Sequence, residues 1–443
     1  MAERLTARDA IGRVAAAFTE LPAPEGKSAP DGPIAWQGYN QQHARAVQRT
    51  GEQESVVCGT ARVGATEVVL ISFEFGFLGG SLGERTGDRL EAAYTHARER
   101  RLPVVSLIAT GGSRMQEGMR ALVQLQRVAR QSTLTRAAGL PQVAVVRDPS
   151  TGGGWATLGA GADVVLALPG AQIGFAGSRV RPADADPAAY TAEAQLAAGH
   201  VDAVVRQEEL RQTLGRWLTL LTALSDAPAE PPRALGRAEL PTTGWEAVQQ
   251  ARSTDRPRAA AYLDAYFETR EAISGDRSGG VDPGMLCGFG LREGRTIAYA
   301  AQCGTATLPA GYRTAARLIR LADRLGLPVL TLIDTPGAAN DAAAERAGAG
   351  PAIADVFAAV AAVRVPVTTL LIGEGGSGGA LALASPENTW ATPDSYFSVI
   401  APELAAAILK RGPEETRATS EQLRLRPQDL VELGIVRGVV PTG

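Results

Sequence analysis

The stretch of sequence that decides the fold occurs twice in this chain. Its first copy reads LPVVSLIATGGSRMQEG at residues 102–118 and LPQVAVVRDPSTGGGWATLGAGADVVLALPGAQIGF at residues 140–175. Its second copy reads LPVLTLIDTPGAANDAA at residues 327–343 and VPVTTLLIGEGGSGGALALASPENTWATPDSYFSVI at residues 365–400. Self-similarity over such a length predicts two copies of one domain, related by internal duplication.

Corresponding positions in the two copies are separated by a constant 225 residues, so Gly153 aligns with Gly378 and Gly154 with Gly379. In each copy a strand pattern runs into a glycine cluster that precedes a helix. The N–H groups of a first helical turn have no intrahelical partner, and they can face a developing negative charge. The repeat therefore predicts oxyanion chemistry in both copies.

Strand and helix patterns alternate around these clusters. Runs of β-branched residues bounded by glycine predict strands over 55–64, 66–75 and 103–109, and helical periodicity covers 89–101 and 118–139. This alternation predicts an α/β fold with parallel or mixed sheets and helices outside. Each copy is expected to have an antiparallel strand pair followed by βα crossovers.

One proline-dense run, SDAPAEPPRALGRAELP at 225–241, is typical of an interdomain linker. We therefore predict an N-terminal domain at 1–225, a linker at 226–241 and a C-terminal domain at 242–443.

The composition excludes several functional classes. The chain has 443 residues, of which 45% are hydrophobic and 21% charged, and its net charge is −3. It therefore lacks the basic surface that nucleic acid or an anionic membrane requires. The start, MAERLTARDA, has no apolar core of a leader, and no apolar run approaches the roughly 18 residues of a membrane span. A cytoplasmic location is expected.

Metal ligands are scarce. The chain holds three cysteines and three histidines, and neither set has the spacing of a zinc site or of a disulfide framework. These residues are Cys58, Cys287, Cys303, His43, His96 and His200. No metal site is expected in this chain.

The segment GEGGSGGA satisfies two short motifs. Gly373, Gly375 and Gly378 form GxGxxG, but this dinucleotide motif belongs in the first βα turn of a domain, and the first copy lacks it. Gly375, Ser377 and Gly379 form GxSxG, the nucleophile elbow of α/β-hydrolases, but the required later histidine is absent because the last one is at position 200. Two interpretations remain: glycines that pack helix against sheet, or an oxyanion hole at a helix start.

Longer motifs carry a family resemblance. VVCGTARVGATEVVLISFEFGFLGGSLGE, ATGGSRMQEG, RDPSTGGGWATLGAGADVVLA and IGFAGSRV in the first half resemble the β subunit of bacterial acetyl-CoA carboxylase carboxyltransferase. PAGYRTAARLIRLADRLGLPVLTLIDTPGA, IGEGGSGGALA, YFSVIAPELAAAIL and QDLVELGIVRGVVP in the second half resemble its α subunit. The resemblance extends from about residue 41 to residue 441.

The resemblance implies two tandem domains of the ClpP/crotonase superfamily. It also implies transfer of a carboxyl group from carboxybiotin to the α-carbon of a short acyl-CoA, most simply from acetyl-CoA to malonyl-CoA. One backbone oxyanion hole would stabilise the thioester enolate and a second the ureido oxygen of biotin. Gly153 and Gly154 are expected to serve the acyl-CoA side, and Gly379 and Ala380 the biotin side.

Further residues are candidates for substrate contacts. Gly79 and Gly80 are expected to line the CoA channel, Gly111 and Gly112 to open the helix near Arg114, and Arg114 or Arg179 to contact CoA phosphates. Phe175 and Tyr396 could line the thioester and biotin pockets. The candidates also include Gly337 and Gly378. For each, an ordinary role as a turn glycine, a salt-bridged arginine or a core aromatic remains open.

Partners follow from the same resemblance. The only lysines, Lys27 and Lys410, have no neighbouring methionine, the usual setting of attached biotin, so the biotin is expected on a separate carrier protein that works with a biotin carboxylase. A homodimer or larger homo-oligomer is implied, with the active site between the N-half of one protomer and the C-half of another.

The sequence departs from the family at three places. It has no four-cysteine zinc ribbon, it reads AAAERAGAG where the α subunit has a glycine-rich GAEERGQ, and it places Trp155 where the family has a small residue. The second change puts the use of biotin in doubt, and the third suggests an altered acyl pocket. Two alternatives to carboxyl transfer therefore remain: a biotin-independent decarboxylase or carboxyl transferase of specialised metabolism, and a non-catalytic assembly subunit.

Overall fold

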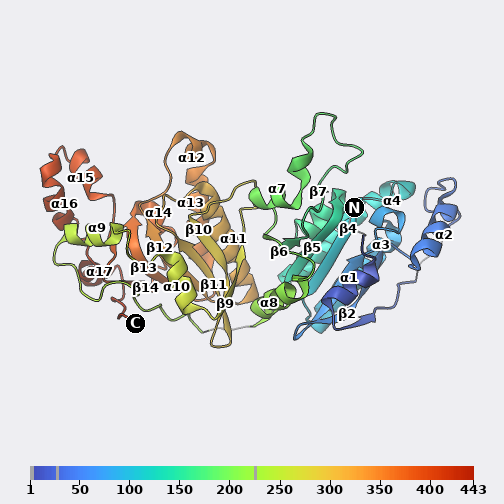
Figure 1. Cartoon of the computed structure of the whole chain (residues 1–443), viewed down its shortest axis with the longest axis horizontal. Helices are drawn as coiled ribbons and strands as arrows, with labels where there is room; N and C mark the ends of the chain where they lie inside the picture. Colours follow the sequence, from blue (N-terminus) through green and yellow to red (C-terminus); the bar gives the residue numbers. More distant parts are fainter. Residues whose placement is uncertain (1–3, 26–28, 224–226) are drawn as a thin grey trace. The chain divides into compact units, whose positions relative to one another are not determined.

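The structure is a computed structural model that describes residues 4–25, 29–223 and 227–443 (Figure 1). It divides into two compact units. Unit 1 comprises Met1–Thr222 with Arg277–Gly279, and unit 2 comprises Ala223–Asp276 with Gly280–Gly443.

The described residues of unit 1 form a sheet with the strand order β1-β2-β3-β4-β5-β6-β8, and β7 pairs with β5. The pairs β1–β2 and β2–β3 are antiparallel, and all later pairs are parallel. The strands are β1 (Ala17–Glu20), β2 (Val56–Val63), β3 (Thr66–Phe73), β4 (Val104–Thr110), β5 (Gln142–Thr151), β6 (Val164–Ala167), β7 (Ile173–Gly174) and β8 (Ala203–Val204).

Helices cover both faces of this sheet. Leu90 and Tyr94 of α3 and Val128 of α5 share one core cluster with Ile71 of β3. Ser72 points to the other face, where its hydroxyl donates to the backbone of α1 at 3.0 Å. The helices are α1 (Ala7–Val14), α2 (Tyr39–Thr50), α3 (Glu84–Arg100), α4 (Met119–Leu122), α5 (Gln124–Ala137), α6 (Gly152–Gly154), α7 (Ala192–Ala197) and α8 (Leu210–Thr222).

Unit 2 repeats this plan in the order β14-β13-β12-β11-β10-β9, with β15 paired to β13. The pairs β9–β10 and β10–β11 are antiparallel, and the rest are parallel. The strands are β9 (Thr269–Ile273), β10 (Met285–Arg292), β11 (Arg295–Gln302), β12 (Val329–Thr335), β13 (Val367–Gly376), β14 (Thr389–Ala391) and β15 (Tyr396–Ser398).

Helix α10 packs Tyr262, Leu263 and Tyr266 onto Leu330 and Leu370 of this sheet. The helices of unit 2 are α9 (Gly244–Arg252), α10 (Ala259–Tyr266), α11 (Pro309–Leu325), α12 (Ala342–Arg346), α13 (Ala349–Ala362), α14 (Ser377–Leu381), α15 (Pro402–Ile408), α16 (Thr416–Gln422) and α17 (Pro427–Glu432). Among the helices described, none combines the length and apolar character needed to cross a bilayer.

The duplication predicted from the sequence is confirmed in detail. The bounds of β4, β5 and α3 recur 225 residues later in β12, β13 and α11. Even an irregularity is repeated, because the pairing register shifts between Ile108 and Thr110 in unit 1 and between Ile333 and Thr335 in unit 2. The expected antiparallel pair followed by parallel crossovers is present in both units.

The proline-dense stretch 226–241 is described from residue 227 onward and groups with unit 2. Ala229 and Ala234 are buried in the α10 core, and Ala234 forms a parallel bridge with Thr442. These residues therefore pack on unit 2, while the domain limits at 225 and 242 remain predictions.

Candidate active site

The first glycine cluster forms a tight turn between β5 and α6. Gly152 has a left-handed φ of 65°, and its N–H donates to the carbonyl of Phe175 at 3.0 Å. Thr151 precedes the helix without a side-chain capping bond. The N–H groups of Gly153 and Gly154 therefore start a helix without intrahelical acceptors, which is the geometry expected of an oxyanion hole.

A second loop of unit 1 lies against this turn. The N–H of Gly111 donates to the carbonyl of Gly79 at 2.8 Å, and the N–H of Gly112 donates to Thr110 Oγ1 at 3.1 Å. A Cβ on Gly112 would lie 3.6 Å from the Cα of Gly152. Gly80 has a φ of 62°, and a Cβ there would lie 2.1 Å from a backbone oxygen, so only glycine fits. The structure thus brings the predicted glycines Gly79, Gly80, Gly111, Gly112, Gly153 and Gly154 to one edge of the sheet.

The short segment after Gly112 differs from the sequence expectation. A 3-10 turn (Met115–Glu117) and the four-residue α4 replace a continuous helix from Arg114, and α5 begins only at Gln124.

The corresponding turn of unit 2 has the same geometry. Ser377, at the position equivalent to Gly152, has a φ of 57°, which is uncommon for a residue with a side chain. No side-chain bond caps α14, so the first N–H groups of this helix also lack intrahelical acceptors. Gly379 and Ala380 are buried, and a Cβ on Gly379 would lie 2.4 Å from the backbone nitrogen of Ala338. Gly337 lies beside this turn, with its N–H donating to Thr335 Oγ1 at 3.1 Å.

Two side chains that the sequence analysis did not single out orient this turn. The Tyr312 hydroxyl donates to the carbonyl of Gly379 at 3.0 Å, and Gln302 Nε2 donates to the same oxygen at 3.3 Å. The C=O of Gly379 and the N–H of Ala380 belong to one planar peptide and point in opposite directions. Tyr312 and Gln302 therefore fix the direction of the Ala380 N–H. The motif PAGYRT, which carries part of the family resemblance, was the available signal for Tyr312, and none of the quoted motifs contains Gln302.

Ser377 resembles a nucleophile elbow in its backbone, because it is exposed at a strand-to-helix turn with a positive φ. However, the three histidines of the sequence all lie in unit 1. Unit 2 therefore offers this serine no imidazole base.

The structure places Arg114 in buried ion pairs, the alternative role that the sequence left open beside a contact with CoA phosphates. The residue is 1% exposed, and its guanidinium is bonded to Glu54 at 2.6 Å and to Glu117 at 3.1 Å. Burial would raise the pKa of Glu54, but the Arg114 charge and hydrogen bonds bring it below its usual 4.5. Arg114 also donates to the carbonyl of Ser81 at 2.9 Å, so it anchors the loops next to the first turn instead of facing solvent.

The structure likewise places Tyr396 in a core cluster, the alternative role that the sequence left open beside the biotin pocket. Its side chain is 1% exposed and packs against α9 in a small core cluster. The hydroxyl donates to Glu374 Oε2 at 2.8 Å, and burial raises the pKa of the phenol. By contrast, Phe175, Arg179 and Gly378 are exposed and accessible to a ligand.

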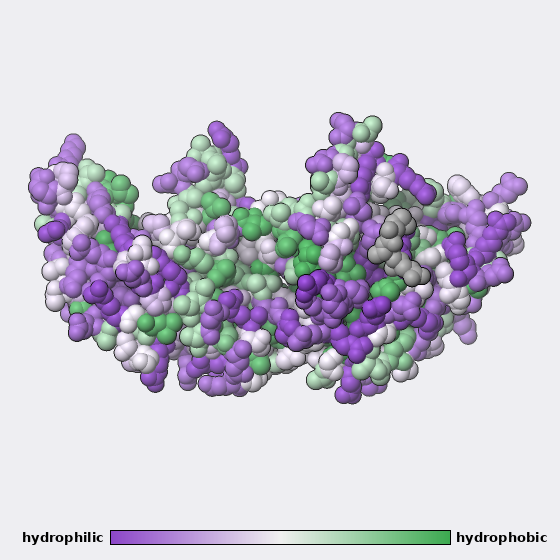
Figure 2. Space-filling model, viewed as in Figure 1, coloured by the Kyte–Doolittle hydropathy of each residue, from purple (hydrophilic) through white to green (hydrophobic). Residues whose placement is uncertain are grey.

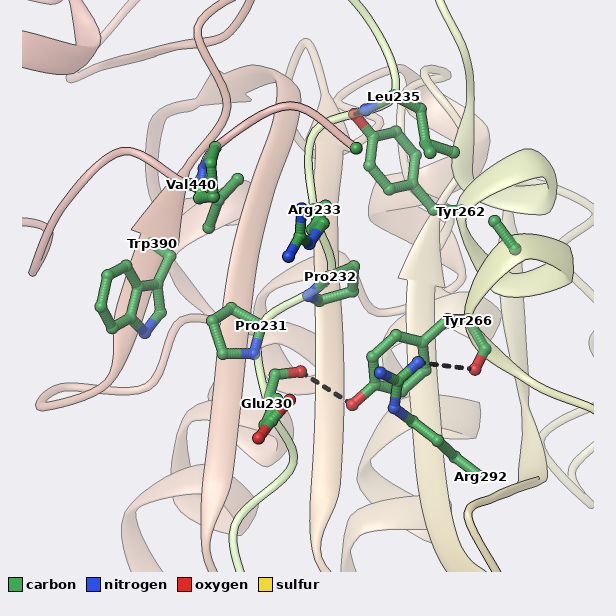
Figure 3. A pocket seen from close by; sticks show the side chains of 13 residues that line it. Glu230, Pro231, Pro232, Arg233, Leu235, Tyr262, Tyr266, Arg292, Trp390 and Val440 are labelled. Atoms are coloured by element: carbon green, nitrogen blue, oxygen red, sulfur yellow. Dashed lines mark hydrogen bonds between the residues drawn. The ribbon is translucent and has the colours of Figure 1, made fainter.

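Unit 2 also contains a cavity of about 510 Å³ that is lined by none of the candidate residues (Figure 3). In it the hydroxyl of Tyr266 donates to the carbonyl of Glu230 at 2.7 Å, and the guanidinium of Arg292 lies 4.2 Å from the Tyr266 ring centroid. Trp390 and Pro231 form the opposite wall (Figure 3). Within the residues described, no group of three or more His, Cys, Asp or Glu is placed to hold a metal ion.

Two parallel-rich sheets, each with an uncapped glycine turn at a helix start, are the arrangement of a pair of crotonase-like domains. The crystal structure of transcarboxylase 12S, solved as a hexamer with hydrolysed methylmalonyl-coenzyme A, matches the fold with a TM-score of 0.79. The match has 19% identity and covers 98% of this chain and 86% of that one.

Sequence comparisons agree with the fold. Residues 33–215 match the carboxyl transferase domain, and residues 239–443 match the acetyl co-enzyme A carboxylase carboxyltransferase-like family. The fused carboxyl transferase subunits beta/alpha of acetyl-coenzyme A carboxylase from Saccharopolyspora erythraea are 39% identical, over 91% of this chain and 74% of that protein. A probable biotin-dependent acyl-coenzyme A carboxylase beta3 subunit from Mycobacterium bovis is 34% identical, over 92% and 84%.

The chain therefore belongs to the acetyl-CoA carboxylase carboxyltransferase family, with its β-like and α-like halves fused in one polypeptide. It is a carboxyltransferase, as the resemblance in the sequence implied.

Proposed function

We propose that this protein transfers a carboxyl group from carboxybiotin, held on a separate carrier protein, to the α-carbon of a short acyl-CoA. The first acceptor to test is acetyl-CoA, which would give malonyl-CoA. The observation that carries the proposal is the pair of equivalent turns, at Gly152–Gly154 and Ser377–Ala380, each with N–H groups that lack intrahelical acceptors. The names of the relatives supply the substrate class.

Each of the two turns would stabilise a different oxygen atom. The N–H groups of Gly153 and Gly154 would hold the thioester oxygen as it gains negative charge, and those of Gly379 and Ala380 would hold the ureido oxygen of biotin. Losing one oxyanion donor typically costs about 3 kcal/mol of barrier. Carboxybiotin, when bound, supplies both the CO2 and the group that takes the α-proton.

The residues of the second turn fit such a ligand. The buried Gly379 has no space for a Cβ, and its peptide is fixed by Tyr312 and Gln302. A neutral ureido oxygen that becomes anionic needs fixed donors of this kind and no ionised side chain. The loop residues 342–350, which depart from the family sequence, form α12 and the start of α13 beyond β12.

The CoA moiety would contact the glycine loops beside the first turn, at Gly79, Gly80, Gly111 and Gly112. Phe175 would lie along the thioester, and the exposed Arg179 is the remaining arginine candidate for the phosphates. Gly337 and Gly378 are the corresponding candidates on the biotin side.

The proposal includes a homodimer or larger homo-oligomer that acts with a biotin carboxylase and a biotin carrier. Large apolar side chains are exposed in both units, and Figure 2 shows apolar surface among the hydrophilic surface of each. Met115, Met119 and Val180 of unit 1 and Val399 and Ile408 of unit 2 are each more than 60% exposed. These side chains are the candidates for the oligomer interface, because contiguous apolar surface marks protein interfaces.

The test uses the purified full chain, a carboxylated biotin carrier and acetyl-CoA, with malonyl-CoA measured by mass spectrometry. We expect product that disappears when avidin sequesters the carrier. If no acyl-CoA from two to eight carbons is carboxylated, the proposal fails. CO2 release from malonyl-CoA that avidin does not affect would support the decarboxylase alternative instead.

A further inference from the structure

A cavity of about 370 Å³ opens beside the first glycine turn, within unit 1. Two of its lining residues are joined to that turn. Trp155 follows Gly154 directly in the chain, and the carbonyl of Phe175 accepts the N–H of Gly152 at 3.0 Å. The cavity is therefore adjacent to the N–H groups assigned to the thioester oxygen.

The aromatic walls of this cavity are fixed by close packing on glycines. A Cβ on Gly159 would lie 2.3 Å from the Trp155 ring, and one on Gly174 would lie 2.7 Å from the Tyr190 ring. The guanidinium of Arg181 lies 3.5 Å from the Tyr190 ring centroid, on top of the phenol. The Trp155 and Tyr190 rings are therefore held in place before any ligand arrives, whereas the Phe175 ring is 76% exposed.

Small residues leave space between these rings. Ala160 and Ala189 line the cavity and are exposed. An apolar protein cavity of about 150 Å³ accommodates benzene. The space is therefore more than twice what a six-carbon group fills, and an acetyl methyl group would leave most of it empty.

We propose that this cavity binds an acyl chain longer than acetyl, with Trp155, Phe175 and Tyr190 as the residues that determine chain preference. The inference deepens the proposed function and rests on it, because the chain enters the cavity from a thioester held at Gly153 and Gly154. The preferred acceptor is then a medium-chain acyl-CoA with an apolar chain, while acetyl-CoA is a smaller acceptor that the same site also binds. Trp155, which departs from the family pattern, is a wall of this cavity and does not fill it.

The apolar walls end at polar groups. The pair His200 and Gln195 lines the cavity, with His200 Nδ1 lying 3.0 Å from Gln195 Oε1. Arg277 lines it as well, and its guanidinium is ion-paired with Asp202. Gln195 Nε2 donates to the carbonyl of Ala189 at 2.9 Å. An alkyl chain gains contacts until it reaches this pair, and further methylene groups gain nothing there.

The test is calorimetric binding of acetyl-, butyryl-, hexanoyl- and octanoyl-CoA to the purified full chain. Each buried methylene strengthens binding about fourfold. Hexanoyl-CoA should therefore bind on the order of a hundredfold more tightly than acetyl-CoA, with a smaller gain from hexanoyl to octanoyl.

Matched variants test whether this cavity causes the dependence of binding on chain length. Ala160→Phe and Ala189→Phe fill the cavity and should remove the dependence on chain length, while acetyl-CoA binding remains. Ala156→Phe and Ala188→Phe place the same ring on exposed neighbours that do not line the cavity. These two variants should retain the dependence of binding on chain length. An equal chain-length dependence in all four variants, or none in the unmodified protein, overturns the inference.

Carboxyl transfer measured in parallel separates the two proposals. Carboxylation of acetyl-CoA without any binding gain from longer chains would retain the proposed function and refute this inference. Absence of carboxylation with every acyl-CoA, together with a clear binding gain, would refute the proposed function and retain the cavity as an acyl site.

Discussion

Adding a single methyl group at Gly379 should show whether the turn at the start of α14 positions an oxyanion donor or only packs against its neighbours. A Cβ at this position would lie 2.4 Å from the Ala338 backbone nitrogen and 2.6 Å from the Tyr312 hydroxyl. Ordinary contact begins at 3.4 Å, so the first turn of α14 must move by roughly 1 Å. A displacement of that size at a reacting centre can cost about a hundredfold in rate.

We therefore expect Gly379→Ala to lower kcat for carboxyl transfer about a hundredfold, while acyl-CoA binding measured by calorimetry is unchanged. Gly12→Ala is the control, because Gly12 also lies in a helix but has nothing within 4 Å of its added Cβ. Urea unfolding of both variants checks that each is folded. If folded Gly379→Ala retains activity within threefold of the control, the turn does not position a donor and the reasoning is wrong.

Three further predictions concern side chains that support the turns. Tyr312→Phe removes one hydrogen bond to the Gly379 carbonyl and should lower kcat about fivefold without changing the KM for acyl-CoA; an unchanged kcat would mean that the tyrosine only packs. Glu54→Gln breaks a buried pair with Arg114 and should lower the free energy of unfolding in urea by about 3–5 kcal/mol, whereas Glu209→Gln in an exposed pair should change it by less than about 0.5 kcal/mol. Because the folded-state pKa of Glu54 lies below its usual 4.5, its stabilising contribution is present above that pH and is lost as pH falls through the folded value. The difference in stability between the unmodified protein and Glu54→Gln should therefore shrink from pH 7 to pH 3, and a constant difference would contradict this assignment.

Much of the fold could be predicted because its signals are local. The strand patterns at 55–64, 66–75 and 103–109 correspond to β2, β3 and β4, and the glycine clusters mark the turns that follow β5 and β13. The repeat added long-range information, since an alignment without gaps implies the same order of strands in both halves. The short edge strand β1 was missed, because four mostly exposed residues have no burial pattern to detect.

The roles of single side chains were harder to predict. Arg114 follows a glycine loop in the sequence, which suggests access to a ligand, but Glu54 comes from a segment 60 residues away and draws the guanidinium inside. Tyr396 is buried because α9 covers it. Conversely, Tyr312 and Gln302 act on the Gly379 peptide from distant elements. Each of these outcomes depends on contacts between segments that the sequence does not place relative to one another.

Because the donors belong to the main chain, the side chains around each turn can change during evolution without removing them. Trp155 and Ala380 occupy the same position of the repeat, one a bulky indole and the other a methyl group, yet both follow a turn of the same conformation. Every amino acid except proline carries an N–H. After a duplication, each copy could therefore change its side chains without losing the N–H donors of its turn. Under the proposed function, one copy would have adapted in this way to a thioester and the other to a cyclic urea.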